Sequence, residues 1–252
     1  MPKTKNKIIT KNKNKDEELP FETKELRRKL DEFLKTKYKF EEFENEIPIG
    51  NIKWGVYAFY DYDGEPIYVG QTNEMIRTRI RRHLTNQRTD AVAMSVLDPF
   101  EVYKIEVWPL PQFQKNSTAN KKSYAYQYLN ALEYEVFCKA IEHSRFKAIL
   151  NEKNPNAPNI SIETPKSFSA IVVSEEVYNL RANADIRNAR RALIISKLAQ
   201  VISERKVQGG LRRTLLTQAK RLQWLAERRY QDLGGDASVV QEGTESDASD
   251  ED

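Results

Sequence analysis

The chain has 252 residues, of which 39% are hydrophobic and 31% are charged, and its formal net charge is +4. Its single cysteine, Cys138, excludes an intramolecular disulfide framework and a cysteine-rich zinc cluster. No apolar run is long enough to cross a membrane, and no hydrophobic segment follows the basic start of the chain. We therefore expect a soluble intracellular protein, located in the cytoplasm or nucleoid or in a nucleus.

The two ends of the chain carry opposite charge. Residues 1–15 contain six lysines and no acid, so we expect 1–20 to be a disordered basic arm. Residues 236–252 contain seven acids and no base, which predicts a disordered acidic tail over 235–252. Without these seven acids the net charge would be +11, so the remainder of the chain is cationic.

Residues 21–51 are expected to hold an N-terminal helix. One helical face carries Leu26, Leu30, Phe33 and Leu34. Pro48 marks the end of this N-terminal segment. We expect the apolar face to pack on the domain that follows.

A β-hairpin is predicted next. Residues 54–60 are rich in β-branched and aromatic residues, 61–64 have turn chemistry, and 67–70 form a second short strand. Because side chains alternate between the faces of a sheet, Tyr57 and Tyr68 should lie on the same face, directly or diagonally opposed. Gly70 has no side chain and leaves room beside them for a ligand or another backbone.

A helix is predicted to follow the hairpin, starting at Thr72 or Asn73. Ile76, Ile80 and Leu84 form its apolar stripe at i, i+4 spacing. Arg79 and His83 are also four apart and fall at the edge of that stripe, so they should point partly toward the sheet. Arg77, Arg81 and Arg82 lie further round the helix, where we expect them to be solvated or to contact phosphates.

A third strand is predicted over 100–110, followed by a polar loop and a helix over 123–143. Glu133 falls in the middle of the apolar face of this helix, whereas Glu135 falls on the far side. A carboxylate in an apolar stripe needs a partner or a cation to offset its burial.

These residues resemble the motifs of the GIY-YIG nuclease superfamily. Gly55-Val56-Tyr57 and Tyr68-Val69-Gly70 match its two triplets, with valine in place of isoleucine in both, and they are followed by Arg79 and His83. The resemblance covers about 52–154, which we take as the catalytic domain. It implies an α+β fold with a small three-stranded antiparallel sheet flanked by helices.

The resemblance also implies roles for individual side chains. Glu133 would hold one divalent cation, Mg²⁺ or another, and Arg79 would brace the scissile phosphate. Tyr57 would act as general base, His83 would accept its proton, and Tyr68 would hydrogen-bond within the site.

Two assignments have alternatives. The helix frame at Leu132-Glu133 selects Glu133 as the metal ligand, but Ala131-Leu132 resembles a frame that would select Glu135. For the supporting asparagine that the superfamily carries after this helix, Asn151 is the first choice and Asn154, which precedes Pro155, is the second.

The C-terminal part is predicted to be a linker followed by basic helices. Asn, Pro and Ser dominate the first part of 155–173, and 174–234 shows helical patterning with a Gly209-Gly210 break that predicts a helical hairpin. Twelve Lys and Arg stand against four acids between positions 184 and 234, which suits a DNA backbone. The arginines expected to contact DNA are Arg190, Arg191, Arg212 and Arg213.

The sequence thus predicts a metal-dependent DNA endonuclease of a restriction, homing or repair kind. The alternative is a DNA- or protein-binding module that keeps the same fold without catalysis. DNA is the expected partner, no membrane is expected, and the oligomeric state stays open.

Overall fold

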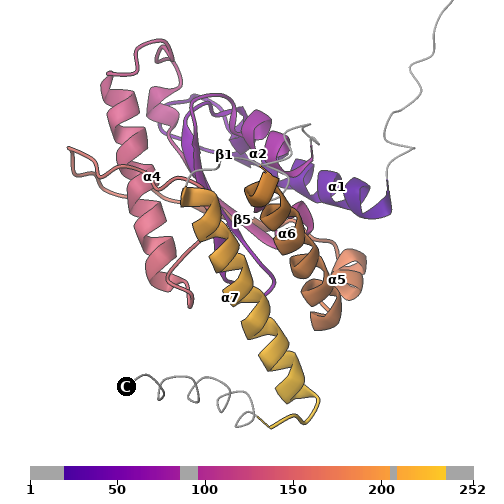
Figure 1. Ribbon diagram of the computed structural model, residues 1–252. Helices are drawn as coiled ribbons and strands as arrows, with labels where there is room; N and C mark the ends of the chain where they lie inside the picture. Colours follow the sequence, from indigo (N-terminus) through magenta and orange to yellow (C-terminus); the bar gives the residue numbers. More distant parts are fainter. Residues whose placement is uncertain (1–19, 86–95, 205–208, 237–252) are drawn as a thin grey trace, which may run out of the picture.

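The computed structural model describes residues 20–85, 96–204 and 209–236 (Figure 1). A four-stranded antiparallel sheet has the order β4-β3-β5-β6. Its strands are β3 (Gly55–Tyr60), β4 (Pro66–Thr72), β5 (Lys104–Pro109) and β6 (Phe168–Ile171). A two-stranded sheet pairs β1 (Lys37–Tyr38) with β2 (Ile47–Pro48). The predicted α+β architecture, an antiparallel sheet with helices, is confirmed.

The main sheet has one strand more than the three that were predicted. Strand β6 lies inside the stretch 155–173 that the composition predicted as a linker, and it pairs along β5. Phe168 contributes the apolar side chain that fixes it, with its ring centroid 4.2 Å from that of Tyr38. A four-residue strand at a sheet edge gives almost no periodic signal, so its partner on β5 is what makes it a strand.

The helices within the described residues are α1 (Phe21–Lys35), α2 (Ile76–Leu84), α4 (Tyr124–His143), α5 (Glu175–Arg181), α6 (Ala184–Glu204) and α7 (Gly209–Asp232). Short 3₁₀ helices span Ile49–Asn51, Pro99–Glu101 and Pro111–Phe113. Within the described residues, no helix is both long and apolar enough to cross a membrane.

The sheet separates two hydrophobic cores. On one face, Val56, Ala58 and Val69 pack with the apolar side of α4. On the other face, Tyr57 and Phe59 pack with residues of α1 and α2, and this core extends to Leu198 of α6 and Leu211 of α7. Figure 1 shows α4 on one side of the sheet, and α1, α2, α6 and α7 on the other. The predicted apolar stripes of α1, α2 and α4 are all buried.

The predicted C-terminal hairpin is formed by α6 and α7. Arg229, near the end of α7, donates from Nε to the carboxylate of Asp185 at the start of α6, at 3.0 and 3.1 Å, so the two helices are antiparallel. The preceding helix α5 is joined to α1, because Arg181 donates to Glu22. The C-terminal region is therefore tied to both the sheet and the N-terminal helix.

An ion-pair network fastens the C-terminal hairpin to the turn between β3 and β4. Asp61 Oδ2 accepts from Arg191 at 3.0 Å and from Arg221 at 2.6 Å, and Arg191 also donates to Glu101 at 3.0 Å. Arg187 pairs with Asp63 and lies 3.7 Å from Asp61. The side chains of Asp61, Arg191 and Arg221 are at most 2% exposed.

The other oxygen of Asp61 shapes the turn itself. Asp61 Oδ1 accepts from the backbone N–H of Asp63 at 2.9 Å and of Glu65 at 3.0 Å. Gly64 follows at φ +73°, a left-handed conformation that glycine adopts without strain. One carboxylate thus holds both the turn and the helices that pack on it.

Asp61→Asn should lower the free energy of unfolding by about 3–5 kcal/mol, because the buried guanidinium groups of Arg191 and Arg221 lose their shared counter-charge. Urea unfolding followed by circular dichroism measures the change. Asp185→Asn is the matched control, since it neutralises the carboxylate of a more exposed pair with Arg229 and should change stability little. Equal effects of the two substitutions would contradict a stabilising role for the buried network.

Candidate active site

The register of the β3–β4 hairpin places two tyrosines on one face of the sheet. Tyr57 pairs with Gly70, and Phe59 pairs with Tyr68, so Tyr57 and Tyr68 are diagonal neighbours. Their ring centroids lie 6.2 Å apart. The predicted common face of the two phenols is confirmed.

Gly70 makes space for the Tyr57 hydroxyl. A Cβ atom at position 70 would lie 2.6 Å from the Tyr57 hydroxyl oxygen and 2.9 Å from a ring carbon of Tyr68. Both distances are shorter than a side chain tolerates, so any residue other than glycine would displace the phenol. The glycine of the second triplet is therefore explained by packing against the tyrosine of the first.

Helix α2 supplies two polar side chains to the Tyr57 hydroxyl. Arg79 Nε donates to it at 3.2 Å, and His83 Nε2 lies 3.2 Å from it. Both reach the same oxygen because residues four apart lie on the same side of a helix. A hydroxyl carries one donor and two acceptor positions, so it can accept from Arg79 while it donates to His83.

Tyr57 is completely buried. Burial raises its pKa well above the ordinary value of a phenol, the neighbouring Tyr68 raises it further, and Arg79 opposes the shift. Burial likewise raises the pKa of Tyr68. Both phenols are therefore protonated at neutral pH.

Glu133 approaches the tyrosines from α4. Burial raises the pKa of its carboxyl to about 7, while the positive charge of Arg79 acts in the opposite direction. Its charge also acts on Tyr57 and Tyr68. Glu135, the alternative metal ligand, lies beside Tyr134 instead. The structure thus brings Glu133 together with the two tyrosines and Arg79.

In a comparison with protein families, residues 53–137 match the model of the GIY-YIG catalytic domain. Residues 53–137 are a GIY-YIG catalytic domain. This domain belongs to a family of nucleases, which are hydrolases of phosphodiester bonds and generally depend on a divalent metal. Comparisons with curated proteins and with solved structures found no significant match. The matched segment contains the tyrosines, Arg79, His83 and Glu133.

Asn151, the expected supporting asparagine, follows the GIY-YIG match and binds the edge strand of the sheet. Its side-chain amide accepts from Val69 N at 3.0 Å and donates to Val69 O at 2.7 Å. Leu150 N donates to Ile67 O at 2.8 Å. Residues 150–151 thereby continue the hydrogen-bond ladder beyond β4 and fix the Tyr68-Val69-Gly70 triplet from its open side. Asn154 instead lines a cavity beside Glu133.

The donor set of the GIY-YIG site fits a hard divalent cation. Within the described residues, no group of three or more His, Cys, Asp or Glu side chains could enclose a metal ion. Mg²⁺ does not require such a cage, because it binds through one or two carboxylates, waters and substrate phosphates. Glu133 supplies one carboxylate, and the amides of Gln71 and Asn130 lie in the same cavity wall.

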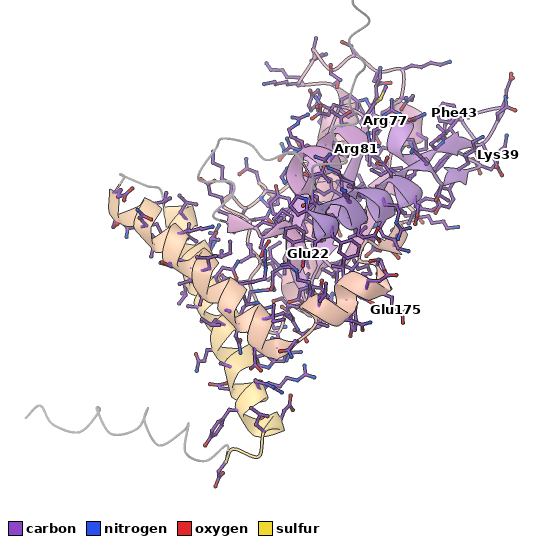
Figure 2. All side chains as sticks on the ribbon, turned by 90° about the vertical axis from the view of Figure 1, so that its right-hand side faces the viewer. Glu22, Lys39, Phe43, Arg77, Arg81 and Glu175 are labelled. Carbon is purple, nitrogen blue, oxygen red and sulfur yellow. The ribbon has the colours of Figure 1, made fainter. Side chains whose placement is uncertain are left out.

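Some of the arginines expected to contact DNA are exposed, and others bond to groups of the protein. Arg77 and Arg212 are exposed, and Figure 2 shows Arg77 and Arg81 on the side of α2 near α1. Arg82 pairs with Glu74, and Arg190 Nε donates to Asp98 at 2.7 Å. Arg213 donates to the carbonyl of Glu152 at 3.2 Å.

Arg191 occupies a position that DNA cannot reach. Its side chain is 2% exposed and is enclosed by Asp61, Glu101 and the carbonyl of Arg221. The expectation that Arg191 contacts DNA is therefore corrected, since its charge is neutralised by carboxylates inside the protein. Its place four residues after Arg187 and three before Ile194, on the buried stripe of α6, was the signal for this in the sequence.

Two polar residues beside Glu133 were not singled out from the sequence. Gln71 follows the second triplet directly, and its Nε2 donates to Asn130 Oδ1 at 3.0 Å. Asn130 precedes Glu133 by three positions on α4, so helical spacing alone places it next to that carboxylate. Both contribute to the amide-lined wall of the cavity beside the GIY-YIG site.

In EDTA, Glu133→Gln should raise the unfolding temperature at pH 8 and leave it close to the wild-type value at pH 4. Burial raises the pKa of the wild-type carboxyl from its ordinary value of 4.5 to about 7 in the folded chain. The unfolded chain therefore binds fewer protons between these values, and the wild type loses stability as pH rises through them. Calorimetry of both proteins measures the effect. Glu135→Gln is the control, and an equal response from it would contradict the assignment of the buried carboxyl.

Proposed function

We propose that the protein is a metal-dependent DNA endonuclease that hydrolyses phosphodiester bonds at the Tyr57–Glu133 site. The observation that carries this proposal is the position of one hydroxyl. The Tyr57 oxygen lies 3.2 Å from both Arg79 Nε and His83 Nε2, in the space that Gly70 leaves for it, and the charge of the Glu133 carboxyl acts on this phenol. This arrangement supplies a proton path, a cation for phosphate and a metal-binding carboxylate.

Because its pKa is raised, Tyr57 is a neutral phenol at rest and not a phenolate. We therefore assign it to a proton relay. In this relay an attacking water gives its proton to the Tyr57 oxygen as the phenolic proton passes to His83 Nε2. His83 becomes the imidazolium, and Tyr57 ends as the neutral phenol with which it began. The resulting hydroxide forms the new P–O bond while the bond to the leaving oxygen breaks. General-base assistance of this kind contributes about 10²–10⁴-fold to rate.

Arg79 links the relay to the phosphate. A guanidinium has five N–H donors, and the Nε–H donates to Tyr57. Its terminal N–H groups are oriented by that bond and would bind the non-bridging oxygens of the scissile phosphate, where negative charge develops. A divalent cation held by Glu133 would add charge stabilisation at the phosphate and the leaving oxygen.

Cleavage assays with varied DNA test the proposal directly. Linear duplex, supercoiled, branched and single-stranded DNA are incubated with the purified full chain in Mg²⁺ or in EDTA, and the product ends are mapped. Cleavage in Mg²⁺ with defined ends supports the endonuclease. DNA binding without cleavage of any form would support the non-catalytic module instead. The ends and the preferred form also separate a restriction or homing activity from a repair-like one.

Tyr57→Phe should reduce the cleavage rate by about 10²–10⁴-fold, whereas Tyr68→Phe should reduce it far less. The first substitution removes the oxygen that Arg79 and His83 share, and the second removes a hydroxyl outside the proposed relay. Single-turnover cleavage with saturating enzyme measures the chemical step. Small and equal losses from the two substitutions would leave both tyrosines with a packing role only.

Glu133→Gln should abolish Mg²⁺-dependent cleavage and preserve DNA binding, because it removes a ligand charge with little change in volume. Glu135→Gln is its matched control on the same helix and should retain activity. Cleavage and fluorescence-anisotropy binding are measured on the same duplex. Loss of cleavage in Glu135→Gln with full activity in Glu133→Gln would reverse the assignment of the metal ligand.

A further inference from the structure

A cavity of about 400 Å³ opens beside Glu133, between α4, the end of β4 and the segment 154–160. Its polar lining consists of Glu133 and six side-chain amides, which are Gln71, Gln127, Asn130, Asn154, Asn156 and Asn159. Its volume lies in the range of small-molecule sites.

The chemistry of this lining selects against phosphate. Among the described residues, neither lysine nor arginine lines the cavity. Side-chain amides instead offer a donor and an acceptor side by side, and they pair with the donor and acceptor pattern on the edge of a nucleobase. The occupant that fits is therefore a neutral group with alternating donors and acceptors.

Gln71 gives a second indication. Its Oε1 is buried and has no hydrogen-bond partner among the described residues, whereas its Nε2 donates to Asn130. A buried acceptor left without a partner is costly, and native structures pair nearly all of them. An amino group on a base edge would supply the missing donor.

The segment 154–160 forms the outer wall of the cavity and is held in place at both ends. Before it, Arg213 donates to the carbonyl of Glu152 at 3.2 Å. After it, the Tyr128 hydroxyl donates to the carbonyl of Glu163 and Lys139 Nζ donates to Thr164 Oγ1, both at 3.0 Å. Pro155 and Pro158 restrict the backbone between these anchors. The asparagines are thus presented by a braced segment and remain exposed to an incoming strand.

We propose that this amide cavity binds the nucleobase next to the scissile phosphate and makes the site sensitive to the base at that position. The proposal rests on the proposed endonuclease function. Glu133 belongs to both sites, so a strand whose phosphate meets Arg79 and Glu133 has its neighbouring base at the cavity.

The test combines a protein variant with removal of single bases. The double variant Asn156→Ala/Asn159→Ala removes two amides from the cavity wall. Asn116→Ala removes an exposed loop amide and serves as control. Oligonucleotides carrying an abasic analogue at each successive position are bound to the full chain in EDTA and followed by fluorescence anisotropy. Cleavage of the same set in Mg²⁺ locates the scissile bond.

One abasic position, adjacent to the cleavage site, should weaken binding by the wild type and by Asn116→Ala about tenfold. The same analogue should weaken binding by the double variant less than it weakens binding by the wild type, because two of the six amides are already lost. The cavity proposal would be overturned if each abasic position affected binding by the wild type and by the double variant equally. It would also be overturned if no abasic position affected binding by the wild type while cleavage was normal. Either result would leave the nuclease proposal intact. If the abasic analogue weakens binding by the wild type more than binding by the double variant, and no DNA is cleaved, the nuclease proposal is overturned and the base-binding cavity stands.

Discussion

The carboxylate of Asp61 is the constraint on which much of the structure depends. Oδ1 accepts from the backbone of the turn that joins β3 to β4, and Oδ2 accepts from Arg191 of α6 and Arg221 of α7. The strands on either side of that turn carry Tyr57 and Tyr68. The C-terminal hairpin is therefore part of the packing that surrounds the GIY-YIG hairpin. Removing either partner alone leaves charge buried without compensation, which makes the two parts interdependent.

The same network neutralises several of the arginines that make 174–234 basic. Arg187, Arg190, Arg191 and Arg221 all face carboxylates of the region between β3 and β5. Their charge offsets Asp61, Asp63, Asp98 and Glu101, so it adds little to the field that DNA meets. A positive sequence balance reports the sum of charges and cannot tell a buried pair from an exposed cation. The exposed arginines, such as Arg77 and Arg212, are the better candidates for phosphate contacts.

Local signals in the sequence predicted most of the fold and the central residues of the candidate site. The alternation in β3 and β4, the i, i+4 stripe of α2 and the position of Glu133 on α4 each depend on neighbours within one element or one hairpin. The missed features depend on distant partners. Strand β6 is a strand because β5 pairs with it, and Arg221 is buried because Asp61 stands 160 positions before it. Their partners cannot be chosen from spacing alone.

The period of two along β4 explains how the site combines its two kinds of chemistry. Tyr68 and Gly70 face the Tyr57 side of the sheet, whereas Val69 and Gln71 face α4 and the amide cavity. A slip of one residue in the register would exchange these faces and remove both sites together. Asn151 opposes such a slip, because its amide pairs with both backbone groups of Val69 on the open side of the edge strand. The asparagine that follows α4 thus acts through the register of β4, and Glu133 lies between the proposed proton relay on one face and the amides on the other.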